Sequence, residues 1–141
     1  MSSQDVSLLF VYGTLMSSAG GALGRSQRAR LAREGRSLGA AAMHGRLYDL
    51  GRYPGLVLSD AAWDVVHGEV VALTEAEKSL RWLDAYEQIV PGRHPHNQYE
   101  RLVCKATLAG GEDVQAWVYV YRQSPTGKPL IPDGRWSAQS G

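Results

Sequence analysis

The chain has 141 residues, of which 44% are hydrophobic and 21% are charged, and its formal net charge is +1. This length and composition predict one globular domain, 1–141, with a core of its own. The near-neutral charge argues against an electrostatic nucleic-acid binder, because such domains carry a marked excess of basic residues.

The cysteine content and the first residues bear on the compartment. A lone cysteine, Cys104, excludes an internal disulfide and fits a reducing compartment. Residues 1–6 show neither the basic nor the apolar region of a secretory signal, and no apolar run has the length of a membrane span. We therefore expect a cytoplasmic protein that contacts neither membranes nor nucleic acid.

The stretch 8–15 (Leu-Leu-Phe-Val-Tyr-Gly-Thr-Leu) predicts a buried strand that stops at Gly13. We expect this glycine to let the backbone turn with φ > 0 and to let a ligand approach the main chain. Backbone N–H groups left unpaired by such a turn can hold a carboxylate or an oxyanion. A core strand followed by a plain turn is the alternative interpretation.

Propensity and turn residues predict the elements that follow. They are a helix over 22–34 that stops at Gly35, a strand over 40–50, a turn over 52–55, a short strand over 56–58 and a strand over 65–73. Thr74, with Glu77 three residues later, predicts a capping box, and the helix after it should end near Tyr86 or Gln88.

The last part of the chain predicts a loop over 89–98, a hairpin of strands 99–108 and 114–121 closed at Gly110-Gly111, and a largely irregular segment over 122–141. Strands outnumber helices and do not alternate regularly with them, which disfavours a doubly wound sheet. The pattern favours an α+β fold, a small mixed β-barrel with two helices packed outside. Alternate residues of 114–121 are apolar or aromatic on both faces, so we expect both faces to be covered.

The second predicted helix carries a carboxylate on its apolar stripe. The stripe consists of Ala76, Leu80, Leu83 and Glu87. Burial would raise the pKa of Glu87 from about 4.3 toward neutrality, which suits a general base. Alternatively, Glu87 lies past the end of the helix and faces water. We expect Glu77, Arg81 and Asp84 on the solvent side of the helix.

A metal site is the rival interpretation of the same region. His94 and His96 follow Glu87, and a His-x-His pair with a carboxylate can bind zinc. No helical His-Glu-x-x-His motif or cysteine pair supports it, so a polar loop without metal is favoured.

Several motifs together resemble a known family. They are Tyr12-Gly13-Thr14-Leu15, Gly45-x-Leu47-Tyr48, Tyr53-Pro54-Gly55, Leu83-Asp84-x-Tyr86-Glu87 and Tyr99-x-Arg101. The combination resembles the γ-glutamylcyclotransferase superfamily, and within it the AIG2-like branch with the γ-glutamylamine cyclotransferases. The similarity spans roughly residues 9–121.

The resemblance implies a small mixed β-barrel with flanking helices and an enzyme of the cyclising acyltransferase or lyase type. Its substrate would be a small γ-glutamyl compound, cleaved to 5-oxoproline and a free amine or amino acid without a metal or other cofactor. It implies that Glu87 is the catalytic acid/base and that the substrate-binding residues are Tyr12, Gly13, Thr14, Leu15 and Tyr99. The family often has glycine after the glutamate, where this chain has Gln88. A non-catalytic barrel that binds a small acidic ligand is the alternative function.

Overall fold

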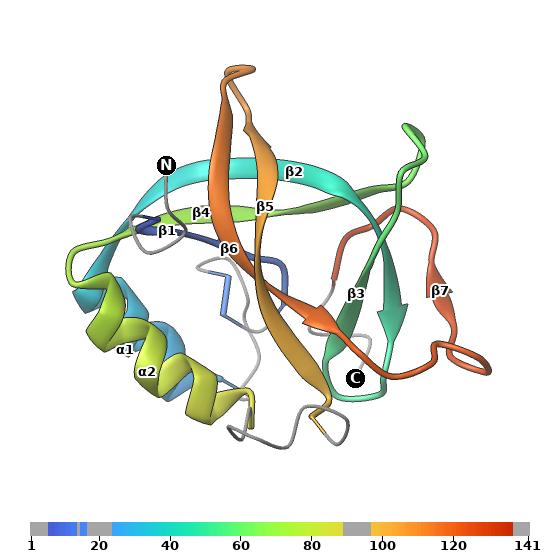
Figure 1. Cartoon of the computed structure of the whole chain (residues 1–141), viewed down its shortest axis with the longest axis horizontal. Helices are drawn as coiled ribbons and strands as arrows, with labels where there is room; N and C mark the ends of the chain where they lie inside the picture. Colours follow the sequence, from blue (N-terminus) through green and yellow to red (C-terminus); the bar gives the residue numbers. More distant parts are fainter. Residues whose placement is uncertain (1–5, 14, 17–23, 89–96, 137–141) are drawn as a thin grey trace.

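A computed structural model describes residues 6–13, 15–16, 24–88 and 97–136. In this part of the chain, five strands close a barrel in the order β2-β4-β1-β6-β5, and the pairing of β5 with β2 completes the circle (Figure 1). They are β1 (Leu8–Val11), β2 (Gly35–Asp49), β4 (Val65–Leu73), β5 (Tyr99–Leu108) and β6 (Asp113–Tyr121). The β1–β6 pair is parallel and the others are antiparallel, so the predicted mixed barrel is confirmed.

The long strand β2 serves two pairings along its length. Its first part pairs with β4 and, at residues 41–42, with β5. Its last part, 45–49, leaves the barrel and pairs with β3 (Pro54–Leu58) on one side and with the short β7 (Leu130–Ile131) on the other. This extension places the start of β3 beside the end of β1, where Pro54 lies against Gly13.

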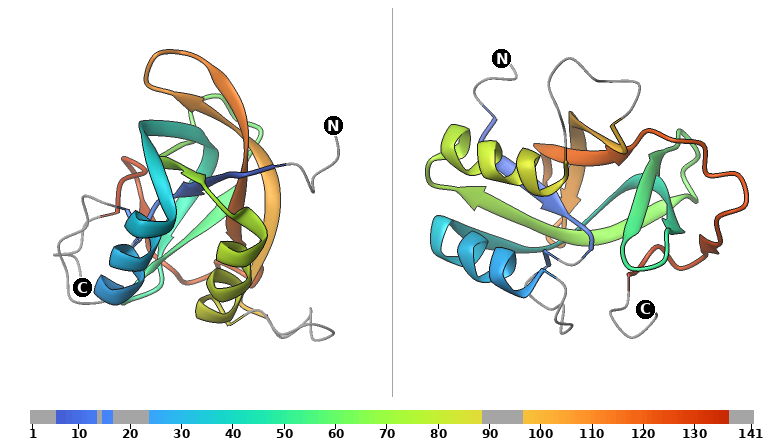
Figure 2. Two further views of the ribbon diagram at one scale, coloured as in Figure 1. Left: turned by 90° about the vertical axis from the view of Figure 1, so that its left-hand side faces the viewer. Right: turned by 90° about the horizontal axis from the view of Figure 1, so that it is seen from below.

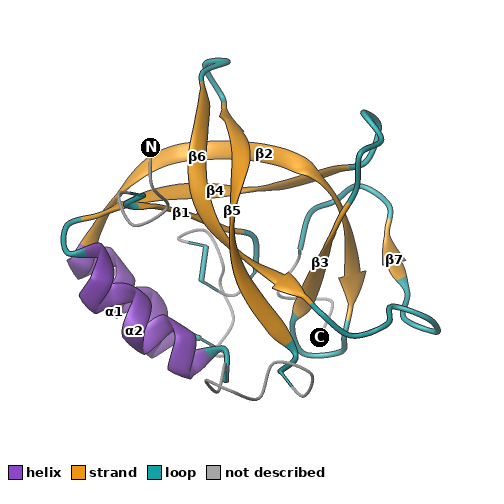
Figure 3. Cartoon of the chain, viewed as in Figure 1, coloured by secondary structure: helices purple, strands orange, loops and turns teal. Residues whose placement is uncertain are grey.

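The helices α1 (Arg25–Glu34) and α2 (Ala76–Tyr86) lie side by side on one side of the barrel (Figures 2 and 3). No helix in the described part of the chain has the length and apolar character needed to cross a membrane. The core has two parts, one inside the barrel and one between barrel and helices. Strand β6 faces both, with Ala116, Val118 and Val120 in the first part and Tyr119 and Tyr121 in the second, as its two-sided pattern predicted.

Several predicted boundaries are wrong, and the reasons are contacts distant in sequence. Thr74 does not cap α2: the N-cap is Glu75, no side chain caps the helix, and the Thr74 N–H instead donates to the Glu34 carbonyl (3.0 Å). Pro54 and Gly55 belong to strand β3 instead of a turn, because they pair with β2. The described part of the segment after β6 is largely irregular, as predicted, apart from β7, which pairs with β2; Trp136 is buried in the barrel core.

The carboxylate of Glu34, at the end of α1, joins the two helices. One oxygen accepts hydrogen bonds from Ser79 Oγ (2.6 Å) and Trp82 Nε1 (2.8 Å), both on α2. The other oxygen accepts one from Arg30 Nε (2.8 Å). These donors, Ser79 foremost, lower the pKa of Glu34 to about 2. The ionised carboxylate therefore stabilises the packing of α1 against α2.

We expect Glu34→Gln to lower the free energy of unfolding at pH 7 by about 1 kcal/mol, since it keeps an acceptor but loses the charge. A lowered folded-state pKa gives stability that is present above the unfolded pKa of about 4.3 and is lost as the pH falls toward 2. The difference in free energy of unfolding between the variant and wild type, measured by urea unfolding, should therefore shrink as the pH falls over that range. The control is Glu77→Gln, whose exposed pair with Arg81 spans 3.8 Å; an equal loss in both variants would contradict the account.

Candidate active site

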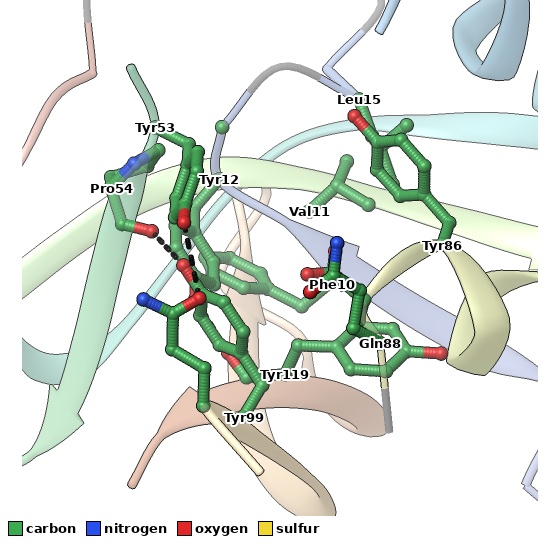
Figure 4. A pocket seen from close by; sticks show the side chains of 13 residues that line it. Phe10, Val11, Tyr12, Leu15, Tyr53, Pro54, Tyr86, Gln88, Tyr99 and Tyr119 are labelled. Carbon is green, nitrogen blue, oxygen red and sulfur yellow. Dashed lines mark hydrogen bonds between the residues drawn. The ribbon is translucent and has the colours of Figure 1, made fainter. Parts of the chain in front are cut away.

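A pocket of about 220 Å³ opens where the end of β1, the start of β3 and the end of α2 meet (Figure 4). Its volume lies below the range of about 300–1,000 Å³ that is usual for drug-sized ligands, so it suits a group the size of an amino acid. The lining residues are Phe10, Val11, Tyr12, Gly13, Leu15, Tyr53, Pro54, Tyr86, Glu87, Gln88, Gln98, Tyr99 and Tyr119.

The pocket includes most of the residues expected from the sequence. Tyr12, Gly13 and Leu15 enter it from the end of β1, Tyr99 from β5 and Glu87 from the end of α2. Thr14 lies outside the described residues. Figure 4 shows Tyr12, Tyr53 and Tyr99 grouped on one side and Tyr86 on the other.

The tyrosine hydroxyls bind the protein's own backbone. Tyr12 Oη donates to the Tyr119 carbonyl (2.5 Å) and accepts from the Leu56 N–H (3.3 Å). Tyr99 Oη donates to the Pro54 carbonyl (2.7 Å). These bonds attach β3 to the barrel and leave the aromatic rings as pocket walls. Burial raises the pKa of both tyrosines above the ordinary range, so both hydroxyls stay protonated.

Gly13 has a different structural role from the one expected. The backbone φ angle of Gly13 is not positive, so the expected turn with φ > 0 is wrong. A Cβ built at this position would lie 3.0 Å from Pro54 Cγ and Cδ, and the Gly13 carbonyl accepts a hydrogen bond from Met16 N–H (3.1 Å). The close approach of β3 therefore favours glycine here, because a larger residue would crowd the Pro54 ring.

Glu87 follows the apolar stripe of α2 into the pocket. Leu80 and Leu83 are buried, and the Glu87 N–H continues the helical pattern by donating to the Leu83 carbonyl (2.9 Å). Burial, followed by the nearby charge of Asp84, raises the pKa of Glu87 to about 7. The carboxyl group is therefore partly protonated near neutral pH and can both accept and donate a proton. It lines the pocket instead of projecting past the helix into bulk water.

Asp84 does not lie on the solvent side as expected. Its Oδ1 accepts hydrogen bonds from Arg101 Nε (2.8 Å) and Tyr119 Oη (2.7 Å), and its Oδ2 accepts one from Arg101 Nη2 (3.1 Å). Sequence reasoning missed these contacts with strands β5 and β6. The available signal was the spacing of Asp84, three residues before Glu87 on the same helix.

The pocket is also lined by three residues that the sequence did not indicate as substrate-binding residues, Tyr53, Tyr86 and Gln98. Tyr53 Oη donates to Gln98 Oε1 (3.1 Å), which links the β2–β3 turn to the segment before β5. His94 and His96 lie outside the described residues, so the zinc interpretation stays a hypothesis. Within the described ranges, no three metal-binding side chains gather into a cluster.

Gln88 has a φ of 60°, a left-handed conformation that favours glycine and costs other residues about 1 kcal/mol or more. Gln88 directly follows Glu87, the C-cap of α2, where a glycine would fit without strain. We expect Gln88→Gly to raise the free energy of unfolding by about 0.5–1 kcal/mol. Gln88→Ala is the control, because it keeps the strain. Equal stability of the two variants in urea unfolding would contradict this explanation.

Glu87→Gln should become more stable relative to wild type as the pH rises. The raised folded-state pKa means that ionisation costs the folded protein stability progressively between the unfolded value of about 4.3 and about 7. Glutamine does not ionise, so the free energy of unfolding of the variant should rise by about 1–3 kcal/mol relative to wild type over this range, with no further rise above it. Thermal unfolding at a series of pH values measures the gap. A gap that is the same at pH 4 and pH 8 would show that the carboxyl group is well hydrated.

Comparison with known proteins gives a consistent result. The model of the family described as "Gamma-glutamyl cyclotransferase, AIG2-like" matches residues 9–138. The Escherichia coli K12 protein YtfP, named as a γ-glutamylcyclotransferase family protein, is 34% identical over 91 residues, which are 64% of this chain and 66% of YtfP. The match thus spans slightly less than two thirds of that relative's length.

Two solved structures share the fold. An AIG2-like protein from Mus musculus superposes with a TM-score of 0.68 at 22% identity, covering 89% of this chain and 86% of the mouse chain. YkqA from Bacillus subtilis superposes with a TM-score of 0.66 at 24% identity, covering 92% of this chain but only 39% of YkqA.

Proposed function

The chain belongs to the γ-glutamyl cyclotransferase, AIG2-like family, and from this premise we propose that it releases 5-oxoproline from a small γ-glutamyl compound, with Glu87 as general acid/base. One observation carries the proposal. A carboxyl group whose pKa is raised to about 7 shares a pocket with the end of the first strand.

The reaction is an intramolecular aminolysis. The substrate's α-amino nitrogen attacks its own γ-carbonyl carbon, a ring C–N bond forms, and the amide bond to the leaving amine breaks. Counted from the neutral amine, one proton moves from the attacking nitrogen to the leaving nitrogen, so no water or redox partner is consumed. Holding the chain folded for attack can contribute about 7–11 kcal/mol to lowering the barrier.

Glu87 suits the proton transfer. A free α-ammonium group has a pKa near 8, and Glu87 has one of about 7, so transfer between them is nearly balanced. The deprotonated carboxylate would take a proton from the α-ammonium group before attack, because only the neutral amine has a lone pair, and a proton would pass to the leaving nitrogen as the amide bond breaks. The proposed base is thus a group that can act in both directions at neutral pH.

The end of β1 would bind the γ-glutamyl group. We assign this role to Tyr12, Gly13, Thr14 and Leu15, with backbone N–H groups opposite the developing oxyanion, where each donor is worth about 3 kcal/mol. The buried rings of Tyr12 and Tyr99 would contact the methylene groups of the substrate and exclude water.

The test is to incubate the protein with γ-glutamylamines, γ-glutamyl dipeptides and glutathione, and to quantify 5-oxoproline by mass spectrometry. We expect release from at least one of them, and a fall in kcat/KM of about 10²–10⁴-fold for Glu87→Gln. The matched control is Glu77→Gln, an exposed glutamate on the same helix, which should keep full activity. Full activity of Glu87→Gln would remove Glu87 from the mechanism, and ligand binding without 5-oxoproline would favour the non-catalytic alternative.

A further inference from the structure

Asp84 joins three elements around the pocket. Arg101 on β5 holds both of its carboxylate oxygens, and Tyr119 on β6 donates to one of them. Arg101 is itself fixed by stacking on Trp117, with its guanidinium carbon 4.2 Å from the ring centroid. The Asp84 and Arg101 side chains are only 27% and 23% exposed, so this pair is much better shielded from solvent than the Glu77–Arg81 pair on the same helix.

Tyr119 continues the connection to the other wall of the pocket. Its hydroxyl donates to Asp84, whereas its carbonyl accepts the hydroxyl of Tyr12. The Tyr12 hydroxyl in turn accepts the N–H of Leu56 on β3. Hydrogen bonds therefore run from the end of α2, through β6, to the end of β1 and to β3.

We propose that Asp84 is a positioning residue for Glu87. Held by Arg101 and Tyr119, it fixes the end of α2 so that Glu87 faces the end of β1, and its negative charge favours the protonated form of Glu87. The inference rests on the proposed role of Glu87. Asp84 lies almost one helical turn before Glu87, so clamping it fixes the rotation of that last turn about the helix axis.

The charges around Glu87 support this role. Tyr12 faces it from just after β1, Tyr99 from β5 and Tyr119 from β6. Burial keeps all three phenols protonated because it raises the pKa of each above the ordinary range. The charge that adds to burial in raising the pKa of Glu87 is that of Asp84. Arg101 partly neutralises Asp84, so it should have the opposite effect on Glu87.

The test is to titrate the Glu87 carboxyl carbon by NMR in the full chain. Asp84→Asn keeps an oxygen acceptor but removes the charge, and it should lower the Glu87 midpoint by about 0.5 pH unit or more. Arg101→Met leaves the Asp84 charge unneutralised and should raise the midpoint by a similar amount. Arg101→Lys restores a positive charge and should return the midpoint toward that of wild type.

These opposite directions separate tuning from a merely structural role, which would move both variants the same way. The control is Asp64→Asn, since Asp64 forms its own ion pair with Arg46 (2.8 Å) outside the pocket lining and should leave the Glu87 midpoint unchanged. Midpoints that shift in one common direction, or that do not shift, would overturn the proposal. If Asp84→Asn does not fold, the test is the rise of the Glu87 midpoint in Arg101→Met and its reversal in Arg101→Lys; an equal midpoint in these two variants would overturn the proposal.

Activity gives a second readout that distinguishes the two proposals. If the protein releases 5-oxoproline, the acidic limb of its kcat/KM profile should move with the NMR midpoint in each variant. Midpoints that move as expected in a protein without cyclotransferase activity would leave the Asp84 network standing and remove the proposed function. Cyclotransferase activity whose acidic limb does not move in any variant would leave the proposed function standing and remove the proposed role of Asp84.

Discussion

The proposed function depends on one poorly hydrated carboxyl group held at the end of a helix. Glu87 closes the apolar stripe of α2, lines a pocket with aromatic walls and has its pKa raised to about 7 by burial and by Asp84. The carbonyl end of a helix also disfavours a negative charge, which acts in the same direction. Such a position costs stability, and it supplies the near-neutral proton acceptor that the proposed reaction needs.

The rest of the fold holds this group opposite the end of β1. Strand β2 extends beyond the barrel to carry β3, whose Pro54 and Leu56 bind the hydroxyls of Tyr99 and Tyr12. On the opposite side, Glu34 fixes α2 against α1. The pocket is thus formed by elements from the first, middle and last parts of the described chain, and each is secured by hydrogen bonds that do not involve a ligand.

The sequence predicted the features that depend on local periodicity. The bounds of β4 and β5 follow from β-branched and alternating residues, and the entry of Glu87 into the pocket follows from the helical repeat of the stripe. It could not predict the features that depend on distant partners. Asp84 looked like a solvated charge because Arg101 and Tyr119 come from strands. Gly13 lines the pocket, but its expected positive φ is wrong, and the close neighbour that favours a glycine there is Pro54 of β3.

The most direct measurement is a crystal structure of the Glu87→Gln variant with an intact γ-glutamylamine bound. The account predicts that the ligand's α-nitrogen lies within hydrogen-bond distance of the side chain at position 87, about 3 Å. It also predicts that the γ-carbonyl oxygen points toward residues 13–15. A ligand that lies outside this pocket, or whose α-nitrogen points away from position 87, would contradict the account.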